Sequence, residues 1–560
     1  MRAKTFFLSL IILAGIPHFY PALAQAGTIP REVSAVLTGR VSSMEEGAME
    51  GVLVSAKKAG STITFTVVSD EHGRYSFPAG RLEPGRYDLR IRATGYDLDG
   101  LKAVDLPPGK TATADLKLRK TADLAAQLTN AEWLMSFPGT EEQKKSVLRC
   151  AHCHTLERVV RSHHDAEEFE QVIERMLRHT PESFPLLVQQ DGPGRIGRPP
   201  AYQDAKQRET LRKQAEYLST LNLSSSSQWS YALKTFPRPK GDATRVIVTE
   251  YDLPEKTRQP HDVVVDSQGT VWYASFGEPI LGKLDPKTGK ATEYQIPVTK
   301  PNAIKGNLDL ALDADQNPWM AMTFQAAVAK FDKKTEKFQV FRLPPDLDAA
   351  YRELTFLSPE HSNVDGKVWV NDSGSYTQFR LDIASGKFET LNPDPTSHPD
   401  VYAVTSDAGN NAYLFVIGSG RIARIDAKTG EYTFYSTPAP DSGPRRGMLD
   451  AQGRLWFGEN RANRIGVFDT HTEKFQEWVA PKSGYLPYDV AVDKHGKAWT
   501  ISEYTDSVLR LDPASGQFTE YLLPRETNMR KAFVDNSTAL VNFWVGNTHG
   551  ASIVRVEPQD

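Results

Sequence analysis

The chain of 560 residues exceeds the usual size of one domain, about 100–200 residues, so several domains are expected. Its 66 lysines and arginines nearly balance its 70 aspartates and glutamates, for a net charge of −4, and no polybasic run is present. This balance excludes proteins that bind nucleic acid through a basic surface. Plentiful aromatic, glycine and proline residues, with many segments of alternating polarity, indicate a globular and mainly β protein.

The N-terminus has the pattern of a secretory signal peptide. Arg2 and Lys4 form a positive start, residues 6–16 are apolar, and the A-Q-A triplet at 24–26 suits a signal peptidase. The apolar run is short for a membrane span, although an uncleaved N-terminal anchor remains the alternative. No later stretch is long and apolar enough for a membrane helix. We therefore expect residues 1–26 to be removed and the mature protein to be periplasmic or secreted.

Residues 31–118 predict a small antiparallel β-sandwich, because apolar and polar residues alternate between clear turn signals. The motifs "SDEHGRYSFPAG" and "PGRYDLRIRATGY" resemble the carboxypeptidase regulatory-like domain. The resemblance implies a fold without chemistry of its own, in which turn formers and core aromatics are structural, although a role in binding carbohydrate or a partner stays open. These expected structural residues are Asp70, Gly73, Tyr75, Phe77, Gly85, Tyr87, Gly95 and Tyr96.

Residues 121–224 change to a helical period, so an α-helical domain is expected between two β domains. Thr140 followed by Gln143 has the spacing of a capping box, which marks a helix start. Acidic residues after Asp165 suit the first turn of another helix, and an apolar stripe with Val172, Ile173 and Met176 follows.

The only two cysteines of the chain, Cys150 and Cys153, stand in this helical part in the sequence C-A-H-C-H, with His154 directly after the second. C-x-x-C-H is the attachment motif of a c-type haem. Each thiol would form one thioether, and His154 would be the proximal ligand of the iron. This attachment takes place outside the cytoplasm, in agreement with the predicted signal peptide.

Three other uses of the cysteine pair are less consistent with the sequence. A zinc site needs further ligands, and no second C-x-x-C exists. A thioredoxin-like pair belongs at a helix start in a βαβ unit, which is missing here. A disulfide across so short a loop would add little stability.

The helical part resembles a small class I cytochrome c domain in "EEQKKSVLRCAHCHTLERVV" and in "LRKQAEYLSTLN", where Tyr217 and Leu218 match the usual helix contact. The family pattern implies a methionine as the sixth iron ligand, and Met176 is the methionine after the motif and before the next domain. Ligation by His163, His164 or His179, or an open position, remains an alternative. Two further residues are candidates for binding the haem propionates, Arg158 and Arg161, and His152 between the cysteines is expected to be exposed.

Residues 246–560 repeat a template that reads approximately P-x-x-V-x-x-D-x-x-G-x-x-W and continues to a D-P-x-T-G turn. Successive marker aromatics are 43–50 residues apart, which is typical of a β-propeller with four strands per blade. The seven markers are Trp272, Trp319, Trp369, Tyr413, Trp456, Trp499 and Trp544. The last copy lacks its final strand, and residues 246–254 can supply it, so the N-terminal strand is expected to close the last blade.

The repeats resemble the streptogramin lyase (virginiamycin B lyase) propellers. That resemblance implies a metal ion, a histidine and a glutamate that open a lactone by elimination. The positions that match are His261, Glu459 and Glu503, with Mg²⁺ as the implied metal, although the set is thinner than in the family. Other residues at the same end favour an anionic ligand, namely Arg445, Arg446, Arg461, Arg464, Arg525 and Arg530.

Taken together, the sequence predicts a multidomain, mainly β protein with a β-sandwich, a cytochrome c-like helical domain and a seven-bladed β-propeller. The expected function is electron transfer by haem c, alone or as a redox-enzyme subunit, with a redox partner protein and with the propeller binding a small-molecule substrate or partner. The alternatives are a metal-dependent lyase acting on a lactone and a binding scaffold without turnover. No nucleic acid and no membrane span are expected.

Overall fold

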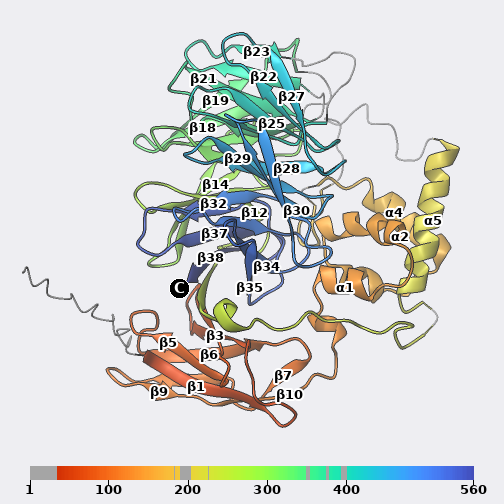
Figure 1. Cartoon of the computed structure of the whole chain (residues 1–560), viewed down its shortest axis with the longest axis vertical. Coiled ribbons are helices and arrows are strands. Elements are labelled where there is room, and N and C mark those ends of the chain that lie inside the picture. The colour runs from red at the N-terminus through yellow and green to blue at the C-terminus, as the bar shows by residue number, and fades with distance from the viewer. Residues whose placement is uncertain are drawn as a thin grey trace, which may run out of the picture. The chain divides into compact units, whose positions relative to one another are not determined.

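The computed structural model describes residues 35–181, 183–189, 204–224, 226–348, 353–373, 377–391 and 400–559. The predicted signal peptide, residues 1–26, lies outside these ranges. None of the helices within these ranges has the length and apolar character needed to cross a membrane. Along the chain a β-sandwich, a group of short helices and a ring of sheets follow one another (Figure 1).

The first segment is a β-sandwich, as predicted, but it is not purely antiparallel, because β1 pairs in parallel with β9 and β10. One sheet has the order β2-β1-β10-β7 with β5 and β9 also paired to β1, and the second contains β4-β3-β6-β8. Tyr75 and Phe77 are buried between the sheets, and the Tyr75 hydroxyl donates to the Ala114 carbonyl. Asp70 accepts backbone N–H groups within its turn, where Gly73 has a positive φ of 70°. The strands are β1 (Ala35–Ser43), β2 (Gly47–Ala48), β3 (Leu53–Lys58), β4 (Ile63–Val68), β5 (Arg74–Pro78), β6 (Gly85–Arg92), β7 (Tyr96–Asp99), β8 (Ala103–Leu106), β9 (Ala112–Thr113) and β10 (Leu116–Lys120).

The second segment consists of short helices around the buried Trp133, which is 0% exposed. The predicted capping box is confirmed: the Thr140 side chain accepts from the Gln143 N–H, and the Gln143 side chain accepts from the Thr140 N–H. Tyr217 and Leu218 are buried in the same core. The elements are η1 (Ala125–Gln127), α1 (Asn130–Ser136), α2 (Glu141–Ser146), η2 (Leu148–His152), α3 (Leu156–Val160), α4 (Ala166–Met176) and α5 (Ala205–Leu221).

The third segment is the predicted β-propeller (Figure 1). A short turn, η4 (Gly241–Thr244), precedes it, and six four-stranded sheets follow in chain order. The first three blades are β12 (Pro260–Val265), β13 (Val271–Ser275), β14 (Ile280–Asp285), β15 (Lys290–Gln295); β16 (Asp309–Leu312), β17 (Pro318–Met322), β18 (Ala327–Asp332), β19 (Lys337–Arg342); and β20 (Leu354–Ser358), β21 (Lys367–Asp372), β22 (Thr377–Asp382), β23 (Phe388–Leu391). The next three are β24 (Ala403–Ser406), β25 (Ala412–Val416), β26 (Arg421–Ile425), β27 (Tyr432–Ser436); β28 (Pro444–Leu449), β29 (Arg454–Glu459), β30 (Arg464–Asp469), β31 (Lys474–Val479); and β32 (Val490–Val492), β33 (Ala498–Ile501), β34 (Ser507–Asp512), β35 (Gln517–Leu522).

The repeat template is explained by one local contact. In the D-x-x-G-x-x-W copies the aspartate accepts backbone N–H groups of its own turn with one oxygen and the tryptophan indole N–H with the other. The indole bond runs from Trp272 to Asp266 at 3.0 Å and from Trp499 to Asp493 at 2.8 Å. The spacing of six residues therefore joins the turn between the first two strands of a blade to the buried aromatic of the second strand.

The closing of the ring is also confirmed. The seventh blade contains β36 (Phe533–Asp535), β37 (Asn542–Asn547) and β38 (Ser552–Pro558), and β11 (Val246–Asp252) pairs antiparallel with β38. The other edge of β11 pairs with β4 of the sandwich, with Tyr251 opposite Ile63, so neither edge of β11 is exposed. One sheet of the sandwich and the last blade thus form one continuous eight-stranded sheet.

Candidate functional site

The cysteine turn, residues 150–153, lies beside a pocket of about 210 Å³ to which two domains contribute. Cys153 and His154 line this pocket from the helical segment, and His549 lines it from the turn after β37 of the propeller. The remaining lining residues are Thr155, Arg158, Phe184, Pro185, Leu186 and Glu526. The rings of Phe184 and His549 are parallel, with centroids 6.3 Å apart.

The protonation of the motif side chains follows from their burial. Burial raises the pKa of Cys150 to about 11, so its thiol is protonated at neutral pH. Burial also lowers the pKa of His154, which keeps the imidazole neutral. Its Nδ1 lies 3.0 Å from the Thr155 carbonyl, which can only accept. Nδ1 therefore carries the proton, and Nε2 has a free lone pair, the arrangement of a metal-ligating histidine.

The cysteine turn docks on the mouth of the propeller, which we define as the end where the innermost strands of the blades begin. Three propeller side chains donate to the two carbonyls between the cysteines. Asn528 Nδ2 lies 3.4 Å from the Ala151 oxygen, and Arg530 Nη2 lies 3.1 Å from the His152 oxygen. His549 Nε2 is 3.0 Å from the same His152 oxygen. The position of both thiols relative to the propeller is therefore set by the propeller itself.

A buried charge cluster, consisting of Arg445, Glu503 and Arg530, lies on the propeller side of this turn. Glu503 Oε2 accepts from Arg445 Nη1 at 2.8 Å, and Glu503 Oε1 pairs with Arg530 Nη1 at 2.9 Å. Burial raises the pKa of Glu503, but the two arginines outweigh it and hold this pKa at about 2. The His152 ring faces the same carboxylate at 4.0 Å, and 37% of its side chain is exposed, so it is less exposed than expected.

The centre of the mouth is filled by a second set of ion pairs. Arg446 binds both carboxylate oxygens of Asp262, at 3.0 and 2.8 Å, and one oxygen of Asp309 at 2.6 Å. Lys531 lies 3.4 Å from each of these carboxylates. The aspartates also accept backbone N–H groups of the neighbouring blade, for example Leu310 N–H on Asp262. They therefore hold adjacent blades together, and protein cations already neutralise them.

The structure does not assemble the three predicted catalytic residues. His261 is fully buried with Nδ1 2.7 Å from Asp262, Glu459 lies at the end of β29 in the fifth blade, and Glu503 belongs to the buried charge cluster. Across the described ranges, no hydrogen bond or ion pair joins any two of the three. The same ranges contain no group of three or more His, Cys, Asp or Glu side chains arranged to hold a metal ion.

The candidates for the sixth iron ligand lie away from the lining of the pocket. Met176 ends α4 and is 37% exposed. His163 Nδ1 is bonded to the Leu223 carbonyl, and His164 faces Glu168 at 3.6 Å. His179 is likewise not a lining residue. The ligation by Met176 stays a prediction.

The arginines predicted to bind propionates or an anion have different surroundings. Arg158 lines the pocket, whereas Arg161 is paired with Asp123 and Glu157. Arg445, Arg446 and Arg530 pair at the mouth with the carboxylates described above, and the other three pair with carboxylates as well: Arg461 with Asp441, Arg464 with Glu477, and Arg525 with Glu250 and Asp252. All six arginines predicted to favour an anionic ligand thus have carboxylate partners within the protein, and anion binding at the mouth stays a prediction.

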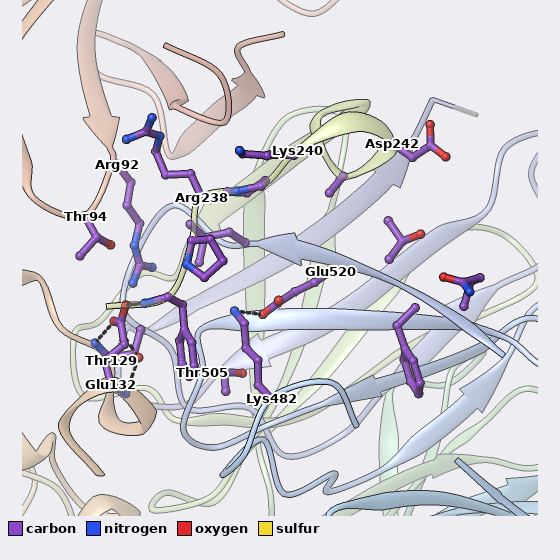
Figure 2. Close-up of a pocket in the computed structure, with 18 residues that line it drawn as sticks. Arg92, Thr94, Thr129, Glu132, Arg238, Lys240, Asp242, Lys482, Thr505 and Glu520 are labelled. Carbon is purple, nitrogen blue, oxygen red and sulfur yellow. Dashed lines mark hydrogen bonds and ion pairs between the residues drawn. The ribbon is translucent and has the colours of Figure 1, made fainter. Parts of the chain in front are cut away.

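A larger cleft of about 430 Å³ lies between the sandwich, the linker before η4 and the sixth blade, and its charged walls are largely paired within the protein (Figure 2). Figure 2 shows Lys482 paired with Glu520 on one wall and Thr129 bonded to Glu132 on another. Arg92 donates to Asp506 at 2.7 Å. We interpret this cleft as an interface between segments rather than as a reaction site.

Sequence reasoning missed Phe184, Glu526 and Asn528. All three stand in segments without a recognisable motif. Phe184 follows α4 in the helical segment, whereas Glu526 and Asn528 belong to the segment between the sixth and seventh blades and lie beside the cysteine turn only in the folded protein. Arg530 was predicted at the mouth, but nothing in the sequence indicated that Arg530 or His549 contacts the residues between the cysteines.

Comparisons with known proteins support two of the three segments. The model of the carboxypeptidase regulatory-like domain matches residues 36–119, and the model of the virginiamycin B lyase family matches residues 389–560, well short of half of the chain. The chain thus contains a carboxypeptidase regulatory-like domain and a virginiamycin B lyase-like propeller. A search of curated proteins found no match.

Several solved structures are similar to this chain at low identity. The selenomethionine-substituted virginiamycin B lyase from Staphylococcus aureus is 19% identical, covers 56% of this chain and 99% of its own, and has a TM-score of 0.48. A streptogramin B lyase structure is 19% identical over 57% of this chain and 99% of its own, with a TM-score of 0.49. The extracellular domain of a putative hybrid two-component system from B. thetaiotaomicron is 12% identical over 55% of this chain and 39% of its own, with a TM-score of 0.41.

Proposed function

We propose that the protein is a c-type haem protein of the periplasm that exchanges electrons with a redox partner protein, with its helical segment as a cytochrome c-like domain docked on the propeller. The observation that carries this proposal is the pocket in which Cys153 and His154 meet residues of the propeller. The C-x-x-C-H motif of Cys150, Cys153 and His154 is the specific chemical support.

The residues present fit a covalently held haem. Cys150 and Cys153 stand three residues apart on one turn, and His154 keeps a lone pair on Nε2 because its Nδ1–H is bonded to a carbonyl. The apolar side chains of Phe184 and Leu186 give the pocket a wall on which a flat aromatic group can lie. A bound haem would supply a one-electron carrier.

The other residues hold and shield this site. Asn528, Arg530 and His549 bind the carbonyls between the cysteines and so fix the turn against the propeller. Arg445, Arg446 and Arg530 at the mouth are each paired with a protein carboxylate, and these ion pairs hold the arginine side chains in place beside the docked turn.

The test is the visible spectrum of the full-length protein, made in a host that attaches c-type haem. We expect a Soret band and a haemochrome of two thioethers, both lost in the double variant C150A/C153A. Normal colour and spectrum in that variant would overturn covalent attachment, and absence of redox change with chemical reductants would overturn electron transfer.

A lyase reaction that opens a lactone is the second candidate, favoured by the match of residues 389–560 to the virginiamycin B lyase family. A structure of the Staphylococcus aureus lyase, in an inactive form, contains quinupristin. The residues here do not fit the Mg²⁺ that this reaction would use, because Arg446 and Lys531 already bind the carboxylates at the centre of the mouth.

Incubation of the full chain with quinupristin and Mg²⁺ distinguishes the two candidates. We expect no ring opening detectable by mass spectrometry. Opening that disappears in H261A would favour the lyase, and opening that persists in H261A would point to a contaminating activity.

A further inference from the structure

We propose that the buried charge cluster of Arg445, Glu503 and Arg530 sets the reduction potential of the haem, so that the propeller is the electrostatic partner of the redox centre. This inference rests on the proposed function. It gives a functional reason why the helical segment docks on the propeller. The attachment motif alone does not explain this docking.

The cluster is in direct contact with the attachment turn. One guanidinium nitrogen of Arg530 donates to the His152 carbonyl, between the two cysteines, at 3.1 Å. Another nitrogen of the same group pairs with Glu503 at 2.9 Å. A change of charge in the cluster therefore changes the electrostatic potential at the turn that carries the two cysteines.

The charges of the cluster are shielded from solvent. Glu503 is 1% exposed, and Arg445 and Arg530 are 7% and 6% exposed. Arg445 lies over the ring of Tyr488, with its guanidinium carbon 3.6 Å from the ring centroid. Charges that are buried among aromatic rings act in a low dielectric and are only weakly screened by salt.

The sign of the effect follows from the charges. Two guanidinium groups and one carboxylate leave one positive charge, because 2 − 1 = 1. A positive charge beside a redox centre stabilises the reduced state, which carries one positive charge fewer. The cluster therefore raises the reduction potential, and Glu503 limits this rise.

Redox titration of the haem-loaded full-length protein, followed by its visible spectrum, tests the inference. E503Q removes the negative charge and is expected to shift the potential upward. R445Q removes a positive charge and is expected to shift it downward. The double variant R445Q/E503Q keeps the net charge and is expected to return towards the wild-type potential.

Opposite shifts distinguish electrostatics from loosened packing, since a disturbed pocket would move both single variants in the same direction. The matched control is E389Q, which removes a carboxylate bound to the buried Arg380 in the third blade, and no shift is expected. If E503Q does not fold, R445K should keep the wild-type potential while R445Q lowers it. If the reduction potentials of haem-loaded E503Q and R445Q shifted in the same direction, or not at all, this inference would be wrong while the proposed function would stand. If the wild-type protein carried no haem, the proposed function itself would be wrong.

Discussion

Replacing Glu503 by glutamine should destabilise the protein strongly, because it leaves Arg445 and Arg530 buried without a carboxylate between them. The pKa of Glu503 falls from 4.5 to about 2, since the two arginines outweigh the opposite effect of burial. Such a shift corresponds to about 3 kcal/mol of folding free energy at neutral pH. Loss of one partner from a buried ion pair typically costs about 3–5 kcal/mol, which agrees.

The pH dependence has a definite sign. A carboxylate whose pKa is lowered by folding contributes stability that is present above its unfolded pKa and is lost as the pH falls towards its folded pKa. The difference in unfolding free energy between wild type and E503Q should therefore be constant above about pH 5.5 and should shrink from pH 4.5 downward.

Urea denaturation followed by tryptophan fluorescence at pH 7, 5, 4 and 3 measures this difference. E389Q is the control, because Glu389 is half-exposed on its side chain, and its loss should change the free energy by less than about 1 kcal/mol. A difference for E503Q below 1 kcal/mol at pH 7, or one that is the same at pH 3 as at pH 7, would refute the reasoning.

Three further substitutions give independent checks. Burial and the neighbouring Glu477 raise the pKa of Glu459, so ionisation of this carboxyl destabilises the folded state once the pH exceeds the pKa of the unfolded chain. E459Q should therefore be more heat-stable than wild type at pH 9 and little different at pH 5. An equal gain at both pH values would contradict this. Trp499 is fully buried with its ring 5.2 Å from that of Phe543, so W499A should lose about 3–5 kcal/mol in urea denaturation, and a loss under 1 kcal/mol would be inconsistent with the packing. H154A should keep the covalent haem by mass but change the spectrum of the ferric form, and an unchanged spectrum would exclude His154 as a ligand.

Much of the fold could be predicted from the sequence, because the interactions that define each blade form between residues close together in the chain. The aspartate and tryptophan of the D-x-x-G-x-x-W template meet within one hairpin, so their spacing alone predicts the blade. The missing last strand likewise predicted the closure by β11. The pairing of β4 with β11 could not be predicted, because nothing in the alternation of a strand identifies its neighbour from another domain.

The candidate site could be predicted only in part, for the same physical reason. The attachment motif is formed by neighbouring residues, so the sequence alone identifies Cys150, Cys153 and His154 as candidates. Asn528 and His549 lie about 400 residues away and reach the turn only through the folded ring. The family resemblance suggested three catalytic residues, but a resemblance cannot show that Glu503 is bound by Arg445 of β28 and by Arg530 of the segment before β36.

The most direct test of the account is the intact mass of the exported full-length protein, together with its spectrum in alkaline pyridine. We predict the polypeptide mass plus that of one haem, and a haemochrome of two thioether bonds. A colourless protein with the mass of the polypeptide alone, from cells that load a control cytochrome c, would contradict the account.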